Sequence, residues 1–363
     1  MSTTTPERAT LPALNDYRLL GRSGLRVSPM CLGVMKFGTG WGSGAEMPES
    51  RRILDYYVER GGNFVDTANI YEAGQSEEFL GQLIQGRRDQ LVVATKYSLL
   101  YQSDNPNAGG NQRKSMMRSV EQSLRRLRTD YIDLLYLHMW DALTPIDEIL
   151  RGFDDLVRQG KVLHAGLSDT PAWQASRMQA VAELRGWTPL VAMQLEYSLG
   201  ERTPERELLP MAREMGFAVT AWAVLGGGLY THAYSLARLR EMSKMGRDES
   251  AAVADYALQR NLVERKLKIA EHVHEVAQEL GKSPAQVAMA WAMTNAPGLI
   301  PLVGVQRLEE LEDNLGALDV TFDPAQVERL NSVSAIELGF PHDMLNTPYS
   351  RAALFGELKV RKI

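Results

Sequence analysis

The sequence predicts an α/β protein, a (β/α)8 TIM barrel, and two observations carry that prediction. Eight short apolar runs recur from one end of the 363-residue chain to the other, and longer segments with helical spacing of apolar residues lie between them. No G-x-G-x-x-G follows the first run, whereas a doubly wound dinucleotide fold usually has that turn and fewer strands. Eight alternations over this length are typical of a closed barrel.

The apolar runs are the expected strands, and helices are expected between them. The runs cover residues 27–35, 63–68, 91–97, 131–138, 162–168, 191–197, 218–224 and 299–305. The clearest helical patterns cover residues 50–60, 113–126, 146–159, 204–215 and 266–280. Four of these segments are followed by a glycine that suits a helix C-cap, namely Gly61, Gly160, Gly216 and Gly281. Ahead of the first strand, residues 17–27 read YRLLGRSGLRV, which predicts a β-hairpin that caps the barrel floor.

The chain is expected to hold one domain with a tail at each end. Residues 1–16 are predicted to be a flexible tail, residues 17–333 the barrel, and residues 334–363 a tail or loop that covers the barrel mouth. Two connections, 99–112 and 226–265, are too long for simple turns. Such stretches usually carry substrate specificity.

Composition excludes several classes of function. The formal net charge is -5, so no positive field attracts nucleic acid or an anionic membrane. Cys31 is the only cysteine, which excludes an intramolecular disulfide and a multi-thiolate metal site, and which suits a reducing compartment. No apolar run approaches the roughly 20 residues that span a bilayer. We expect a cytoplasmic protein with no membrane insertion, no nucleic-acid partner and no metal site.

Three polar residues end successive apolar runs. Asp66 ends the second run, Lys96 the third and His138 the fourth, and Tyr71 follows in the loop after Asp66. Taken singly, a strand-end acid or a core histidine is more often structural. In a (β/α)8 barrel, however, the carboxyl ends of the strands meet at the catalytic face, so these four side chains are expected to form one site.

The four side chains suit proton transfer to a carbonyl. A lysine ammonium stabilises a phenolate, so Lys96 is expected to lower the pKa of Tyr71 and make it a usable acid. Asp66 keeps Lys96 charged, and His138 orients the carbonyl oxygen or shares in proton transfer. One alternative is a Schiff-base lyase with Lys96 as nucleophile, but it needs a neutral lysine, which Asp66 disfavours.

The segments that carry these residues resemble the aldo-keto reductases over nearly the whole chain. They include GRSGLRVSPMCLGVMKFG, GGNFVDTANIY and SLRRLRTDYIDLLYLH. The bacterial and potassium-channel-β-like branch, which includes aryl-alcohol dehydrogenase-like proteins, is the most similar. The resemblance implies an oxidoreductase that transfers hydride between a nicotinamide cofactor and a small-molecule carbonyl. It also leaves open a cofactor-binding regulatory subunit, like the channel β subunits.

The resemblance further implies where the cofactor lies. Ser168, Asp169 and Gln194 would hold the nicotinamide carboxamide, Trp222 would stack on its ring, and residues 225–229 would approach the pyrophosphate through glycine amides. The full expected cofactor set is Gly33, Val34, Met35, Ser168, Asp169, Gln194, Trp222, Ala223, Leu225, Gly226, Gly228, Gly304, Gln306, Arg307, Glu310 and Asn314. The expected substrate pocket includes Lys36, Tyr101 and Trp140.

The sequence departs from the family pattern at four places. Asp169 stands where many relatives have Asn, Ala223 and Val224 where Ser-Pro is common, and Lys36 where Thr is common. In the adenosine segment the usual arginine is absent, but Arg307 can reach a 2′-phosphate. Glu310 nearby would repel phosphate or accept from a ribose 2′-hydroxyl. NADP(H) is the expected cofactor and NAD(H) the alternative. The oligomeric state is not predicted.

Overall fold

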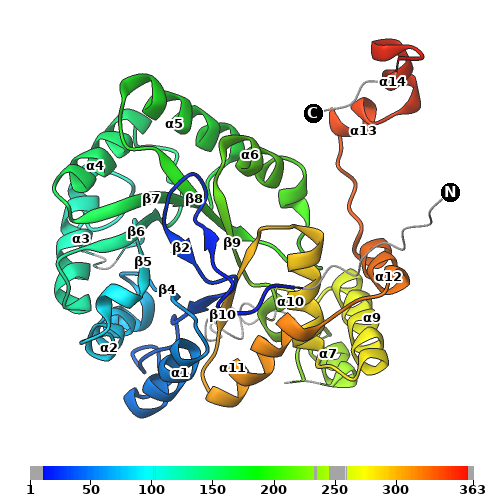
Figure 1. The fold of residues 1–363 in the computed structure, drawn as a ribbon, viewed down its shortest axis with the longest axis horizontal. Helices are drawn as coiled ribbons and strands as arrows, with labels where there is room; N and C mark the ends of the chain where they lie inside the picture. Colours follow the sequence, from blue (N-terminus) through cyan, green and yellow to red (C-terminus); the bar gives the residue numbers. More distant parts are fainter. Residues whose placement is uncertain are drawn as a thin grey trace.

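The computed structural model describes residues 11–100, 102, 104–232, 235–244, 258 and 260–358. Within them, eight parallel strands close into a barrel in the order β10-β3-β4-β5-β6-β7-β8-β9, with helices around the outside (Figure 1). This confirms the predicted (β/α)8 barrel. The predicted tail at residues 1–10, and Tyr101 of the expected substrate pocket, lie outside the described residues.

Each predicted apolar run contains one barrel strand, and only β8 begins a residue earlier than predicted. The strands are β3 (Cys31–Gly33), β4 (Phe64–Asp66), β5 (Val92–Tyr97), β6 (Ile132–Leu137), β7 (Val162–Ser168), β8 (Leu190–Glu196), β9 (Ala218–Trp222) and β10 (Ile300–Gly304). Parallel strands with helices on one face and a filled barrel on the other are buried on both faces. That is why these strands read as continuous apolar runs.

The helices follow the predicted patterns, with one division. They are α1 (Met47–Glu59), α2 (Gln75–Leu83), α3 (Arg113–Leu127), α4 (Ile146–Arg158), α5 (Ala172–Arg185), α6 (Leu208–Met215), α7 (Leu236–Met242), α9 (Glu264–Leu280), α10 (Pro284–Asn295), α11 (Leu308–Leu315) and α12 (Pro324–Ser334). The helix expected over 204–215 divides into η3 (Thr203–Glu205) and α6. Pro210 has no N–H for the Arg206 carbonyl, so the helix begins only at Leu208. The four expected capping glycines all have positive φ.

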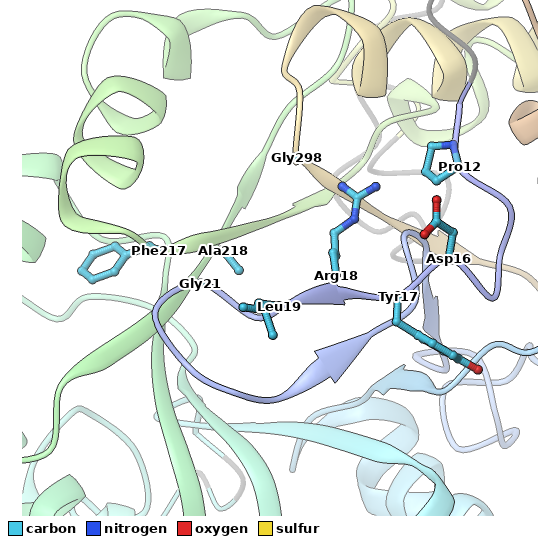
Figure 2. Close-up of a pocket in the computed structure, with 9 residues that line it drawn as sticks. All are labelled: Pro12, Asp16, Tyr17, Arg18, Leu19, Gly21, Phe217, Ala218 and Gly298. Carbon is cyan, nitrogen blue, oxygen red and sulfur yellow. The ribbon is translucent and has the colours of Figure 1, made fainter. Parts of the chain in front are cut away.

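The predicted hairpin closes the floor of the barrel. Strands β1 (Arg18–Leu19) and β2 (Arg26–Val27) pair antiparallel, and Leu20 and Val27 are buried with residues of the barrel strands. Figure 2 shows the hairpin below β9, with Arg18, Leu19 and Gly21 around a pocket that Phe217 and Ala218 also line. The hairpin therefore covers the end of the barrel opposite the carboxyl ends of the strands.

The chain after α12 leaves the barrel. Helices α13 (His342–Leu345) and α14 (Pro348–Phe355) stand away from it in Figure 1. The segment that leads to them contacts the start of α6, because Arg206 donates to the Glu337 carbonyl at 2.6 Å and His342 pairs with Glu207 at 2.8 Å. The expectation that residues 334–363 cover the barrel mouth stays a prediction. No helix among the described residues has the length and apolar character that a membrane span needs.

Gly21 offers a test of how the hairpin is held. Its φ is +56°, and an added Cβ would lie 2.1 Å from the Val191 carbonyl oxygen. We expect Gly21→Ala to lower the free energy of unfolding by more than about 2 kcal/mol, because it adds backbone strain and a clash. Urea unfolding measures this. Gly24→Ala in the same hairpin, where the Cβ would meet nothing within 4 Å, is the matched control. If Gly21→Ala and Gly24→Ala were equally stable, the close packing of the hairpin against the barrel at Gly21 would be contradicted.

Candidate active site

Strand periodicity directs three of the predicted site residues into the barrel mouth. Side chains two residues apart on a strand share a face. Phe64, Ala94 and Tyr136 belong to the buried cluster that also contains hairpin residues, whereas Val65, Val93 and Leu135 belong to the cluster shared with the helices. The inward-facing rows continue two residues further to Asp66, Lys96 and His138.

Asp66 and Lys96 form an ion pair that is almost completely shielded from solvent. Lys96 is fully buried and Asp66 is 2% exposed, and the ammonium donates to the carboxylate and, at 2.8 Å, to the Thr67 carbonyl. Gln194 donates its amide to the other Asp66 oxygen at 3.0 Å. Burial disfavours a charged lysine, but Asp66 and Tyr71 outweigh that effect and hold the pKa of Lys96 above its ordinary value. Lys96 is therefore charged.

Tyr71 lies beside this pair on a strained turn. It begins η1 (Tyr71–Gly74), in which Glu72 and Ala73 take left-handed conformations with φ of 48° and 57°. Its ring centre is 4.9 Å from the Lys96 ammonium nitrogen, and its hydroxyl is 3.4 Å from His138 Nε2. The structure thus brings all four predicted catalytic residues together.

Burial dominates the titration of Tyr71 and His138. Burial raises the pKa of Tyr71 above its ordinary value, and the Lys96 charge opposes this effect without reversing it. Lys96 therefore has the expected lowering effect, but the pKa of Tyr71 is still raised in the free protein because desolvation of the phenolate outweighs that effect. Burial and Lys96 also hold the pKa of His138 well below its usual value. The site presents a neutral phenol and a neutral imidazole above a charged lysine.

Among the buried polar atoms that lack a hydrogen-bond partner within the described residues, two lie at the carboxyl ends of β6 and β7. They are Ser168 Oγ, at the end of β7, and His138 Nδ1. A buried polar atom without a hydrogen bond costs about 1–3 kcal/mol, so such atoms point to a missing ligand or water. Ser168 and Gln194 are paired in register on neighbouring strands, which sets their polar groups side by side. This arrangement fits a nicotinamide carboxamide.

Asp169 and Trp222 extend that face of the mouth. Trp222 is partly exposed, and its indole N–H donates to the Asp169 carboxylate at 3.1 Å. Asp169 has a φ of 42°, a conformation that Asn and Asp adopt more readily than other side chains. Burial raises the pKa of Asp169 to about 6, and the hydrogen bond from Trp222 limits that increase. Trp222 offers an aromatic face to a flat ring.

The glycine loop after β9 exposes backbone where a phosphate is expected. η4 (Gly226–Gly228) consists of three glycines, all with positive φ, and Ala223 before it has a φ of 55°. Backbone in this conformation lets amide N–H groups converge on an anion. Leu225 and Gly227 are partly exposed. Nothing lies within 4 Å of where a Cβ on Gly228 would be. The N–H groups of Gly226 and Gly228 donate to the Ala223 and Leu225 carbonyls at 2.8 and 3.1 Å, so other amides of the loop would have to meet a pyrophosphate.

The expected adenosine segment, Gly304 to Asn314, runs from the last residue of β10 into α11. Gly304 ends β10 next to Gly33 of β3, and Asn314 is buried within α11. Glu310 accepts from the Gln306 backbone N–H at 2.9 Å and pairs with the Arg307 guanidinium at 2.8 Å. The Glu310 charge that would repel a phosphate is therefore partly neutralised by Arg307. The Arg307 side chain itself is 70% exposed.

Comparison with known proteins fits this geometry. The model of the aldo/keto reductase family matches residues 29–335, which is most of the chain and the whole barrel. The chain belongs to the aldo/keto reductase family. Membership makes it an oxidoreductase of a family that uses nicotinamide cofactors.

Three relatives of this aldo/keto reductase come from fungi. Norsolorinic acid reductase of Aspergillus flavus is 37% identical, over 94% of this chain and 86% of its own length. Aryl-alcohol dehydrogenase [NADP(+)] of Phanerodontia chrysosporium is 41% identical, over 88% and 86%. A putative aryl-alcohol dehydrogenase of Saccharomyces cerevisiae is 35% identical, over 92% and 90%. These relatives support the aryl-alcohol dehydrogenase side of the expected branch, not specifically its bacterial or channel-β-like side.

The aldo/keto reductase mouth also contains residues that sequence reasoning missed. Trp41 contacts the Tyr71 ring, and Glu72 pairs with Lys36, so the Lys36 charge expected in the substrate pocket is neutralised. Trp140 lies two residues past His138, and its backbone N–H donates to the Asp169 carbonyl at 3.4 Å. The sequence feature that could have identified Trp41 is its position as an aromatic residue inside a glycine-rich loop directly after the first strand.

The titration of Asp169 predicts a pH-dependent stability difference. The folded state holds the Asp169 proton up to a pKa of about 6, against an ordinary value of 3.8, so this residue lowers the free energy of unfolding as pH rises through that interval. Asp169→Asn removes the effect. The stability of the variant relative to wild type should therefore rise by up to about 3 kcal/mol between pH 4 and pH 7.

Urea unfolding at both pH values measures this difference. Asp130→Asn, at an exposed aspartate, controls for the loss of one carboxylate. A relative stability of Asp169→Asn that stays the same across the interval would contradict the raised pKa.

Proposed function

We propose that this chain is an NADP(H)-dependent oxidoreductase that acts in the cytoplasm. It reduces the carbonyl group of an aldehyde or ketone, or catalyses the reverse oxidation of the alcohol. The observation that carries the proposal is the convergence of the Tyr71 hydroxyl, His138 and the buried Lys96 ammonium at the barrel mouth. The names of two relatives above add aryl alcohols to the candidate substrates.

Tyr71 is the proposed general acid. Its phenol is neutral in the free protein, so it holds the proton that a carbonyl oxygen gains on reduction. The phenolate left behind would lie 4.9 Å, measured from the ring centre, from the Lys96 ammonium, which stabilises it electrostatically. Neutral His138 directs Nε2 toward the same position and orients the carbonyl oxygen. Asp66 keeps Lys96 charged and correctly placed.

The residues proposed to hold the cofactor surround this acid. A bound reduced nicotinamide supplies the hydride. Ser168, Asp169 and Gln194 would hold its carboxamide, and Trp222 would stack on the ring. The backbone of residues 225–229 would approach the pyrophosphate, with Ala223 beside it. The segment from Gly304 to Asn314 would receive the adenosine. Gly33, at the end of β3, and the following Val34 and Met35 would also contact the cofactor.

NADP(H) is proposed over NAD(H) on two grounds. The exposed Arg307 guanidinium can form two parallel hydrogen bonds to a 2′-phosphate, a geometry that suits guanidinium groups. A relative 41% identical to this chain is named as an NADP(+) enzyme. Glu310, paired with Arg307, is the residue that argues for NAD(H).

Two other functions remain alternatives. A Schiff-base lyase would need a neutral Lys96, and the buried pair with Asp66 disfavours that state. A regulatory subunit that binds cofactor without turnover would keep the same cofactor residues but would not need the four converging catalytic side chains. NADPH and NADH consumption with a panel of aldehydes, ketones and keto-sugars separates these cases.

Removal of the Tyr71 hydroxyl tests the catalytic assignment. We expect Tyr71→Phe to lower kcat for carbonyl reduction by about 10²- to 10⁴-fold, because the general acid is lost. NADPH binding, followed by fluorescence, should be retained because the ring remains. Tyr131→Phe, whose hydroxyl bonds to Asp89 away from the site, is the matched control. A near-normal rate in Tyr71→Phe would refute the assignment.

Removal of the Arg307 charge tests the cofactor assignment. We expect Arg307→Gln to reduce the preference for NADPH over NADH by about tenfold or more, because a bidentate contact to the 2′-phosphate is lost. Dissociation constants for both cofactors measure the ratio. Arg329→Gln, another arginine paired with a glutamate, is the control. If Arg307→Gln weakened both cofactors equally, or neither, the NADP(H) assignment would lose its structural basis.

A further inference from the structure

The chain after α12 forms an arm, residues 335–358, that leaves the barrel at the start of α6. Two contacts hold the base of the arm. The Arg206 guanidinium donates to the Glu337 carbonyl at 2.6 Å, and His342 pairs with Glu207 at 2.8 Å. Beyond this base, α13 and α14 stand away from the barrel (Figure 1). The contacts at the base therefore direct the arm outward from its own barrel.

The arm exposes a large share of the apolar side chains on the surface. Of the sixteen large apolar side chains that are exposed in the described part of the chain, seven lie within residues 340–358, and they are 42% to 85% exposed. They are Phe340, Met344, Leu345, Tyr349, Leu354, Phe355 and Leu358. Together they offer on the order of 800 Å², about what one partner contributes to a standard protein interface. Helices as short as α13 and α14 are not stable alone in water, so the arm needs a surface to pack against.

The rim of the barrel mouth exposes a second set of apolar side chains. They are Leu100 after β5, Met139 and Leu143 after β6, and Trp173 at the start of α5, and they are 49% to 88% exposed. The loops that carry them are joined to one another. The Met139 backbone N–H donates to the Ser98 hydroxyl at 3.1 Å, and the Trp140 backbone N–H donates to the Asp169 carbonyl at 3.4 Å. This rim is an apolar surface to which an apolar arm can bind.

The arm and the rim also differ in charge. Residues 351–363, which include the end of the arm, contain four basic side chains and one acidic side chain, whereas 36 of the 40 basic and 44 of the 45 acidic side chains lie elsewhere. The rim segment 141–148 contains Asp141, Asp147 and Glu148 and no basic residue. Asp147 in this segment and Arg351 in the arm are both exposed. The basic end of the arm is therefore attracted to the acidic segment beside Leu143.

We propose that two copies of this chain exchange arms, so that the arm of each copy covers the apolar rim of the other copy's barrel mouth. Both surfaces belong to the same chain, so a twofold axis satisfies both at once. An arm that turned back onto its own rim would have to give up the contacts of Glu337 and His342 with α6. Each mouth is then completed by a segment of the other copy. The inference does not depend on the proposed reductase activity.

Association in solution is the first test. We expect sedimentation equilibrium at micromolar concentration to give twice the mass of one chain. Tyr349→Glu combined with Leu354→Glu should raise the dissociation constant of the dimer by about tenfold or more, because two charges would enter an apolar contact. Leu143→Glu on the rim should also weaken the dimer. Leu184→Glu, at a leucine 85% exposed near the end of α5, is the matched control. Thermal unfolding checks that each variant is folded.

Crosslinking identifies the surface that the arm covers. Tyr349 is replaced by p-benzoylphenylalanine in full-length chains, and unlabelled chains are mixed with chains labelled with heavy nitrogen at low concentration, then concentrated and irradiated. Mass spectrometry of the products separates crosslinks between copies, which combine both isotopes, from crosslinks within one chain. We expect mixed-isotope crosslinks from the arm to peptides that contain Leu100, Leu143 or Trp173.

Several results would overturn the proposal. They are a chain that stays monomeric, a dimer that the arm variant weakens no more than Leu184→Glu does, and an irradiated sample without crosslinks from the arm. Crosslinks confined to single-isotope products would place the arm on its own barrel and would also overturn the exchange. Mixed-isotope crosslinks to another surface would overturn the rim as the binding surface. None of these measurements uses turnover, so the reductase proposal and the arm exchange can fail separately.

Discussion

The ion pair between Lys96 and Asp66 is the interaction on which the catalytic face depends. Both side chains are buried inside the barrel mouth, where an unpaired charge would cost several kcal/mol. The Thr67 carbonyl and the Gln194 amide supply the remaining hydrogen bonds of the pair. Four segments of the chain, β4, its following turn, β5 and β8, therefore meet at one charged centre. The position of Tyr71 above that centre follows from it.

The same burial determines the protonation of the neighbouring groups. A phenolate or an imidazolium in this environment would lose its hydration, so Tyr71 and His138 stay neutral while Lys96 stays charged. In the proposed mechanism, the charge of Lys96 acts once Tyr71 has released its proton. It would then favour the phenolate of a transition state over that of the resting protein, as electrostatic catalysis requires.

A second buried pair, Lys36 with Glu72, stabilises the other side of the catalytic turn. Glu72 and Ala73 adopt left-handed backbone that costs of order 1–3 kcal/mol per residue unless the surroundings enforce it. The contacts of Glu72 with Lys36 and with the Trp41 backbone provide that enforcement. Tyr71 is therefore held between two ion pairs, one below it in the barrel and one in the loop beside it.

The sequence by itself determined the barrel, its eight strands, the floor hairpin and the four residues of the proposed catalytic group. An apolar run and its two-residue period are local properties of the sequence. Asp66, Lys96 and His138 each end such a run, and the period turns their side chains inward. Only the tertiary structure decided how these groups titrate and what Trp41, Lys36 and Glu72 do. Desolvation of Tyr71 depends on every neighbour at once. The pairing of Lys36 with Glu72 joins residues 36 positions apart, whose contact no local pattern encodes.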